Sequence, residues 1–257
     1  MPPPFPRAAR AAAIITALLH AGAAAAQWLT ACTSDGEPAP AAIVERFMSA
    51  DCAACWSRPA QVPAAGELAL DWIVPSPRGD EAPLSAAATR DSTERLASLG
   101  LKAPAATSTR RAAVAMRAPQ GPQPVQQQAL PGLRVARGVP VGGYLGTAMR
   151  YLPPAGRQPP RPGAPLTAWL LLVETLPTGT EGSPVERNLV RNALAAPWSG
   201  PALQLDGDGP LGYQERRSMS IPAGARPERL RLVGLLQDAR GRIQAAAVSR
   251  CAPPATQ

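Results

Sequence analysis

The order of apolar and polar residues predicts two buried strands near the start of the chain. Residues 41–47 and 67–74 are nearly continuous apolar runs, as in parallel strands that are covered on both faces. Between them, a helix is expected to begin at Cys55. Pro59 and Pro63 follow soon after and predict that this helix kinks or ends early.

A second helix is predicted over residues 85–99. Ser85 is placed to cap its first turn, small and apolar residues recur at helical spacing, and Gly100 suits its end. Residues 41–100 therefore run strand, helix, strand, helix. This order is typical of an α/β domain with a parallel sheet.

The next region, residues 102–165, is rich in proline, glutamine and glycine. This composition predicts loops between short strands. The short strands are expected at 111–116, 133–137 and 144–151.

The last part of the chain predicts a β-rich region. Residues 166–174 form a strong apolar run. The runs at 230–237 and 242–250 flank a turn at 238–241 and predict a closing hairpin. Residues 185–194 fit a helix or a strand.

The first 26 residues have the composition of an export signal. Arg7 and Arg10 precede an apolar run that is too short and too rich in alanine for a membrane span, and alanines at 24–26 offer a cleavage site. Residues 29–32 also fit a lipobox, in which Cys32 would be lipidated. The sequence thus predicts a periplasmic or secreted protein, with a membrane-anchored lipoprotein as the alternative.

Composition argues against several classes of function. The formal charge is +8, but the arginines are scattered and the aromatic residues few, unlike a surface that binds nucleic acid. The single histidine, His20, lies in the export segment, so the mature chain would lack an imidazole-dependent triad and a histidine-bound zinc site. No metal or organic cofactor is expected.

The four cysteines are expected to form two pairs. Cys52 and Cys55 form a local C-x-x-C pair. Export implies an oxidising compartment, so Cys32 and Cys251, near the two ends of the mature chain, are expected to form a structural disulfide. Such a bond would stabilise the fold by about 2–4 kcal/mol, because it restricts the unfolded chain. If Cys32 is lipidated instead, Cys251 is a free or partnered thiol.

The C-x-x-C pair is the candidate redox site. A cysteine after a strand and at the start of a helix meets the partial positive charge of the helix N-terminus, which favours a thiolate. Cys52 would attack a disulfide and Cys55 would resolve the mixed disulfide. Asp51 is expected to raise the pKa of Cys52, and Arg58 to oppose that effect. The alternative is a permanent structural disulfide.

The motif and its surroundings resemble a family of exported bacterial proteins with a thioredoxin-like fold and no assigned function. Residues 43–55 are similar to its V-E-L-[FY]-T-S-x-G-C-S-S-C opening, and residues 68–72 look like a worn form of its H-V-D-Y-W strand. Residues 168–191 are similar to its later apolar strand and the motifs that follow it. Residues 232–247 look like its closing hairpin. The resemblance implies a thioredoxin-like fold.

The sequence also departs from that family. The family histidine is missing near Ala69, and the T-P-Q motif, whose proline faces the cysteines in such folds, has no clean counterpart. Pro104 fits best by the order of elements and would help to dock a substrate. Pro119 and Pro140 are the alternatives.

Three further features have alternative roles. Trp56 fits an apolar docking surface beside the cysteines as well as it fits the core. Asp71 and Trp72 lie near the edge where α/β sites form, but a loop-capping aspartate and a core tryptophan are expected. Glu181, Glu186 and Arg191 fit a functional face of the C-terminal region, but a solvated surface with a salt bridge is expected.

The predicted fold class is α/β, a thioredoxin-like N-terminal domain followed by a β-rich C-terminal region. The predicted function is an exported thiol–disulfide oxidoreductase whose partners are envelope thiol or disulfide proteins, or a redox partner that recharges the pair. The alternative is a non-catalytic envelope binding or structural protein with a locked Cys52–Cys55 disulfide. The predicted segments are a signal at 1–26, a lead-in at 27–40, a thioredoxin-like domain at 41–125, a connection at 126–165, a β-rich region at 166–251 and a tail at 252–257.

Overall fold

The computed structural model describes residues 30–116, 131–154, 165–199, 202–205 and 211–251. The expected export signal and Pro119 lie outside these ranges. Among the helices described, none is long and apolar enough to cross a membrane.

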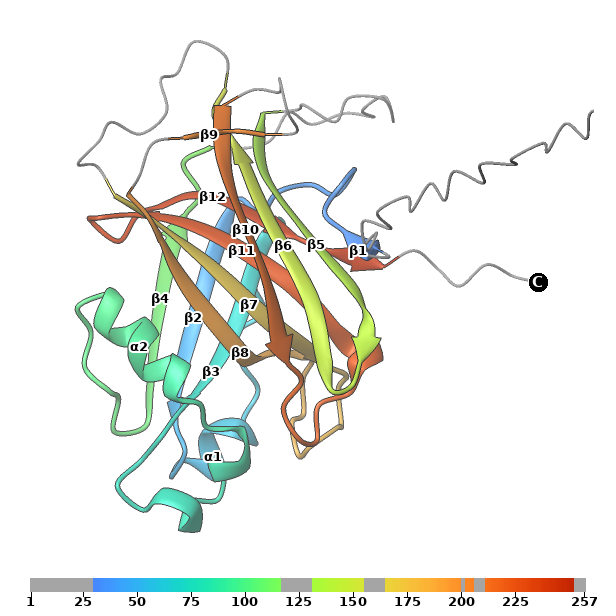
Figure 1. Ribbon diagram of the computed structural model, residues 1–257. Helices are drawn as coiled ribbons and strands as arrows, with labels where there is room; N and C mark the ends of the chain where they lie inside the picture. The colour runs from blue at the N-terminus through green and yellow to red at the C-terminus, as the bar shows by residue number, and fades with distance from the viewer. Residues whose placement is uncertain (1–29, 117–130, 155–164, 200–201, 206–210, 252–257) are drawn as a thin grey trace, which may run out of the picture.

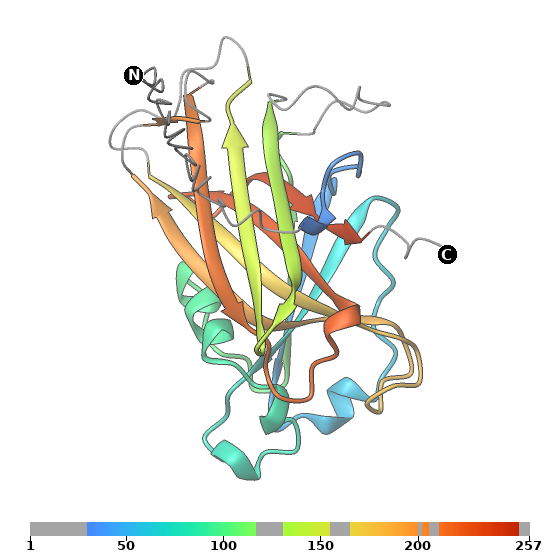
Figure 2. The same ribbon diagram turned by 45° about the vertical axis from the view of Figure 1, so that its right-hand side comes forward.

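Two β-sheets make up most of the described chain (Figure 1). The six-stranded sheet has the order β13-β1-β5-β6-β10-β9, and the seven-stranded sheet the order β12-β11-β7-β8-β3-β2-β4. Figures 1 and 2 show β5, β6 and β10 as one layer across β7 and β11, with both α-helices outside this sandwich. The first sheet contains β1 (Thr30–Thr33), β5 (Gly132–Val141), β6 (Tyr144–Leu152), β9 (Leu203–Gln204), β10 (Leu211–Ser220) and β13 (Arg250–Cys251). The second contains β2 (Ala42–Ser49), β3 (Glu67–Val74), β4 (Thr107–Ala113), β7 (Leu166–Leu176), β8 (Arg187–Trp198), β11 (Leu230–Asp238) and β12 (Ile243–Val248).

The described helices are short. The two α-helices are α1 (Ala53–Trp56) and α2 (Arg90–Ser98). Three 3₁₀ turns accompany them, η1 (Gly79–Glu81), η2 (Ser85–Ala87) and η3 (Pro227–Arg229).

The seven-stranded sheet is mixed. β3 runs parallel to both of its neighbours, β2 and β8, and the other pairs are antiparallel. β4 is an edge strand, and the chain that leaves it continues to the opposite edge of the sheet. There, the backbone N–H of Ala115 donates to the carbonyl of Ile243 at 3.0 Å, and the N–H of Met116 donates to the carbonyl of Gln244 at 2.8 Å. The sheet is therefore curved enough for its two edges to meet at one end.

Apolar side chains fill both faces of this sheet. On one face, Leu170, Leu232 and other residues pack against Met149 and its neighbours from the six-stranded sheet. On the other face, Phe47 and Trp72 stack at 5.9 Å between ring centroids, within a second cluster that Leu96 of α2 completes. Trp72 is thus a core residue, as expected.

The predicted α/β thioredoxin-like fold class is wrong, because the described chain is mostly β-strand. Only one strand–helix–strand unit, β2-α1-β3, has the predicted parallel pairing. Antiparallel strands from the C-terminal half extend the same sheet beyond β3, through β8, β7, β11 and β12. Strands from both predicted regions therefore share one sheet, and their side chains share the cluster that contains Phe47 and Trp72.

The first helix is much shorter than predicted. It runs from Ala53 to Trp56 instead of beginning at Cys55. The hydroxyl of Ser57 donates to the carbonyl of Ala53 at 2.8 Å, and Pro59 follows two residues later. Competition by a serine hydroxyl and the missing N–H of proline explain the early end.

The second helix begins later than predicted. Residues 85–87 form a 3₁₀ turn, and Ala88 makes a bridge to Ile73 of β3. Thr89, and not Ser85, caps α2 by accepting from the backbone N–H of Ser92 at 3.3 Å. Gly100 follows the helix with φ +65°, a conformation that favours glycine, as expected.

The strand predictions agree better with the structure. The strand at 67–74 and the closing hairpin are confirmed, with Gly241 in the left-handed region at φ +75°. Residues 185–194, which fitted either element, form most of β8. The short strands of the middle region are present as β4, β5 and β6, each longer than or shifted from its predicted range.

The expected Cys32–Cys251 disulfide is confirmed. The two residues face each other in the antiparallel pair of β1 and β13, which joins the two ends of the described chain. Their sequence separation is 219 residues. Cys32 is buried, and the sulfur that a lipid would occupy is bonded to Cys251.

Candidate redox site and the adjoining groove

The second disulfide, Cys52–Cys55, closes the turn that follows β2, and residues 52–55 are here called the redox turn after the role expected of them. The backbone N–H of Cys52 donates to the carbonyl of Ser49 at 2.9 Å, which turns the chain away from the strand. The N–H of Cys55 then donates to the carbonyl of Cys52 at 3.0 Å, so Cys52 is the residue immediately before α1. Both cysteines are half-buried. The bond is therefore a local clamp within reach of solvent.

The helix after Cys52 contains only four residues. A helix dipole sums aligned peptide units, and four of them provide little of the field expected of a long helix. The prediction that a helix N-terminus activates Cys52 therefore lacks its structural basis. Any activation of the thiol must come from side-chain charges and from exposure.

Charged side chains surround the pair unevenly. The Asp51 carboxylate lies 3.8 Å from Nε of Arg78, a partner that the sequence did not suggest. This contact weakens the negative charge beside Cys52. Arg58 is exposed, and its guanidinium makes no hydrogen bond or ion pair with any residue that the structure describes. It is thus available to an incoming anionic group.

Trp56 is buried behind the disulfide and does not offer its ring as an exposed docking surface. Its indole N–H donates to the carbonyl of Glu181 at 2.6 Å. Glu181 has φ 48° and is the one residue other than glycine with a positive φ in the described ranges. A strained turn 125 residues further along the chain therefore holds the tryptophan beside the cysteines.

Arg187, the first residue of β8, fixes the backbone of the same segment. Its guanidinium lies 4.6 Å from the centre of the Trp56 ring and donates to the carbonyls of Trp56 and Arg58, at 2.8 and 3.1 Å. It also donates to the Ser183 hydroxyl at 2.8 Å. One buried arginine thus links the redox turn to the C-terminal half of the chain.

Asp71 lies beneath this arginine, in the middle of β3, and is fully buried. One carboxylate oxygen accepts from Arg46 at 2.7 Å and the other from Arg187 at 3.2 Å. Burial raises the pKa of Asp71, and the two guanidinium groups oppose that shift. Burial likewise lowers the pKa of Arg187. Asp71 is therefore a buried ionic link, and the expected loop-capping role is wrong.

The expected salt bridge at Arg191 is present, but the solvated surface expected around it is wrong. Arg191 is buried and donates to Glu174 at 2.7 Å and to Glu181 at 3.1 Å. Glu174 in turn accepts from the backbone N–H of Arg226 at 3.1 Å. These contacts hold the turn that bears Glu181, and so act on Trp56 indirectly.

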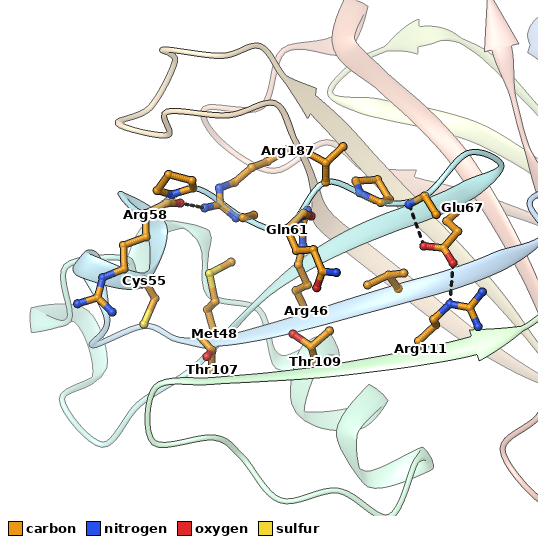
Figure 3. Close-up of a pocket in the computed structure, with 16 residues that line it drawn as sticks. Arg46, Met48, Cys55, Arg58, Gln61, Glu67, Thr107, Thr109, Arg111 and Arg187 are labelled. Carbon is orange, nitrogen blue, oxygen red and sulfur yellow. Dashed lines mark hydrogen bonds and ion pairs between the residues drawn. The ribbon is translucent and has the colours of Figure 1, made fainter.

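A groove of about 590 Å³ extends from Cys55 along the sheet (Figure 3). Its floor consists of alternate side chains of β2 and β4, and its roof is residues 58–64, here called the overlying segment. The lining residues are Val44, Arg46, Met48, Cys55, Arg58, Pro59, Ala60, Gln61, Val62, Pro63, Ala64, Glu67, Thr107, Thr109, Arg111 and Arg187.

Side chains of the sheet hold the overlying segment at three points. Arg187 binds the carbonyl of Arg58, as described above, and Arg46 donates to the carbonyl of Gln61 at 3.3 Å. Glu67 accepts from the backbone N–H of Ala64 at 3.0 Å. Hydrogen bonds from side chains of the sheet to the backbone of the overlying segment therefore fix the roof of the groove.

The far end of the groove has a charged pair. Arg111 of β4 donates to Glu67 at 2.6 Å, and this hydrogen bond lowers the pKa of Glu67. Figure 3 shows the pair at the opposite end of the groove from Cys55 and Arg58, with Thr107 and Thr109 between. The groove can bind a segment of another polypeptide that has both apolar and anionic side chains.

Pro104 lies three residues before β4, is half-buried and does not line the groove. No described peptide bond is cis. Pro140, the other described alternative, lies in β5 of the other sheet. The structure thus brings Cys52, Cys55 and Trp56 together and leaves each of these prolines off the groove.

Sequence reasoning missed Arg46, Arg187 and the groove. A signal was present, because Arg46 and Asp71 are charged residues inside largely apolar strands. A charge in such a place needs a buried partner of opposite sign. Arg187 is the third residue of this ionic group. It lies 116 residues from Asp71 in the sequence and could be found only once the fold was known.

No protein-family model matches the sequence, and a search of curated proteins finds no match. Among solved structures, HBP35 of Porphyromonas gingivalis aligns with 85% of this chain and 78% of its own, at 12% identity and a TM-score of 0.43. A likeness of this degree establishes neither a shared fold nor a shared function.

Proposed function

We propose that the protein is a thiol–disulfide oxidoreductase of an oxidising compartment, with Cys52 and Cys55 as its redox pair. The observation that supports this most is the position of the disulfide, half-buried at one end of a groove of about 590 Å³. Exposed disulfides have higher reduction potentials than protected structural ones. The two disulfides of the chain are consistent with a protein outside the cytoplasm.

The reaction transfers two electrons between this pair and a client protein. In the reduced state, the Cys52 thiolate attacks a client disulfide, forms a mixed disulfide and releases one client thiolate. The Cys55 thiolate then attacks the Cys52 sulfur, which releases the second client thiolate and restores the Cys52–Cys55 bond. The reverse sequence oxidises a client dithiol. A dithiol or disulfide redox protein of the same compartment returns the pair to its starting state.

The second candidate is a non-catalytic binding protein in which Cys52–Cys55 stays oxidised. The contacts of Arg187 favour it, since they fix the carbonyls on both sides of Ser57 and would resist movement of the turn. A lipid on Cys32 is compatible with either function only if the Cys32–Cys251 bond is absent. Mass spectrometry of the mature N-terminus distinguishes the lipidated form from the disulfide-bonded one.

Oxidation of a dithiol peptide by the purified oxidised protein tests the proposal. We expect one peptide disulfide for each protein molecule, with Cys52 and Cys55 recovered as thiols by alkylation and mass spectrometry. The C32A/C251A variant is expected to react like the wild type, and C52A/C55A not at all. Exchange that persists in C52A/C55A, or that is absent from the wild type, contradicts the proposal.

A further inference from the structure

The groove beside the redox pair has more positive than negative charge. Four arginines line it, Arg46, Arg58, Arg111 and Arg187, with Glu67 as the one lining carboxylate. Asp71 lies behind the wall and binds two of the four. Four guanidinium groups against two carboxylates leave a net charge of +2 around the groove.

The arginines differ in how far their partners neutralise them. Asp71 is shared between Arg46 and Arg187, so one carboxylate serves two guanidinium groups. Arg111 is 61% exposed and reaches Glu67 through Nε. Arg58, beside the disulfide, has no partner among the described residues. The charge that no carboxylate matches therefore lies at Arg58, next to Cys55, and on the Arg46–Arg187 pair. At the other end Arg111 is matched by Glu67 through Nε, but its terminal N–H groups are exposed and have no partner among the described residues.

The shape of the groove suits an extended chain. Thr107, Thr109 and Arg111 occupy alternate positions of β4, so they face the same side of the sheet. Thr107 is opposite Met48, just before the redox turn, whereas Arg111 is opposite Val44. The four-residue step from Thr107 to Arg111 spans about 13 Å at the rise of a strand.

We infer that the groove binds an extended acidic segment of a client protein, whose cysteine lies at the disulfide and whose carboxylate, four residues away, lies at Arg111. This inference rests on the proposed function and adds a substrate class to it. We take the spacing from the step between Thr107, which lies beside the end of β2 where the turn begins, and Arg111. Side chains four apart in an extended chain also point to the same side. Val44 and Met48 of the floor and Pro59 and Val62 of the roof contact the apolar residues in between.

Glu67 sets the strength of this preference, because it competes for Arg111. Replacing it with glutamine keeps an oxygen for the N–H of Ala64 and removes the competing charge. The E67Q variant should therefore bind acidic segments more tightly than the wild type. In E67Q/R111Q both charges are gone, and with them the preference.

Peptide binding to the oxidised protein tests the inference without any exchange reaction. The probes are eight-residue peptides with serine in place of cysteine and glutamate four residues before or after it. Matched peptides have glutamine at that position, or glutamate three residues away, where it faces the other side. Affinity is measured by fluorescence anisotropy at 0.15 M salt, which weakens attraction to the overall charge of +8.

We expect one of the two glutamate peptides to bind about twofold tighter than its glutamine counterpart in the wild type, where Glu67 competes, and about fivefold tighter in E67Q, the usual upper value for a partly exposed charge pair. The preference should be larger in E67Q than in the wild type and vanish in E67Q/R111Q. It should be unchanged in R90Q, which removes an exposed arginine of α2 outside the groove.

Equal binding of the glutamate and glutamine peptides in both chain directions would overturn the inference. So would a preference of the same size in the wild type and E67Q/R111Q, since that result assigns it to overall charge. The proposed function is judged separately. If the groove prefers acidic peptides but Cys52–Cys55 exchanges with no dithiol, the inference about the groove is supported and the proposed oxidoreductase function is contradicted.

Discussion

The two disulfides of this chain lie in opposite surroundings. Cys32–Cys251 joins paired strands 219 residues apart, and Cys32 is buried. Cys52–Cys55 closes a turn of one strand–helix junction, is half-buried and borders a groove. The difference teaches that loop length and exposure vary independently of the bond itself: a long closed loop favours a stabilising role, and exposure favours the exchange that we propose for Cys52–Cys55.

The largest effect should come from the ionic link beneath the redox turn. Asp71→Asn removes a fully buried charge and leaves Arg46 and Arg187 without their carboxylate. Such a loss is expected to lower the free energy of unfolding by about 3–5 kcal/mol. Urea denaturation measures it.

The matched control lies near the other disulfide. Asp35→Asn disrupts an exposed pair with Arg134 and should cost less than about 1 kcal/mol. If both variants lost the same small amount, the redox turn would not depend on a buried ionic link.

The next effect should come from the long-range bond. The C32A/C251A variant should lose about 2–4 kcal/mol of unfolding free energy, because the bond restricts almost the whole unfolded chain. Its rate of exchange with a dithiol peptide should be unchanged. A variant of native stability would show that β1 and β13 hold together without the bond.

The local bond should matter less for stability and more for chemistry. Its loop is only a few residues long, so C52A/C55A is expected to lose about 1–2 kcal/mol by the loop-closure relation. Exchange should be abolished. A loss larger than that of C32A/C251A in the same denaturation series would reverse the comparison between the two bonds.

The smallest effect should come from the hydrogen bond behind the cysteines. Trp56→Phe keeps an aromatic ring over Arg187 and removes the indole N–H that reaches Glu181. We expect a loss of about 0.5–1.5 kcal/mol in unfolding free energy. The rate at which a dithiol reagent reduces Cys52–Cys55 should rise, with no change for Cys32–Cys251, as followed by alkylation and mass spectrometry. Equal rises at both bonds would show general loosening of the fold.

Strands were easier to predict from the sequence than the fold class. An apolar run such as 67–74 specifies a buried strand by local pattern alone, and β3 has those bounds. The length of the helix after Cys52 depends on a competition: residues 53–56 favour a helix, whereas Ser57 and Pro59 end it. The pattern of apolar and polar residues alone did not resolve this competition. The thioredoxin-like prediction failed because strands from the distant C-terminal half join the same sheet.

The candidate site was predictable only in part. The spacing of Cys52 and Cys55 is local and visible, and the Cys32–Cys251 pair followed from position in the chain and compartment. The groove depends on the parallel and antiparallel neighbours of β2, and its arginines come from four separate segments. Such an arrangement has no sequence spacing to reveal it.

The reduction potential of Cys52–Cys55 tests the central claim most directly. Equilibration of C32A/C251A in glutathione or dithiothreitol redox buffers, followed by alkylation and mass spectrometry, reports this bond alone. A redox-active pair should have a potential above about −300 mV, in the range of exchanging disulfides. A potential well below about −300 mV would show a locked structural bond and contradict the account.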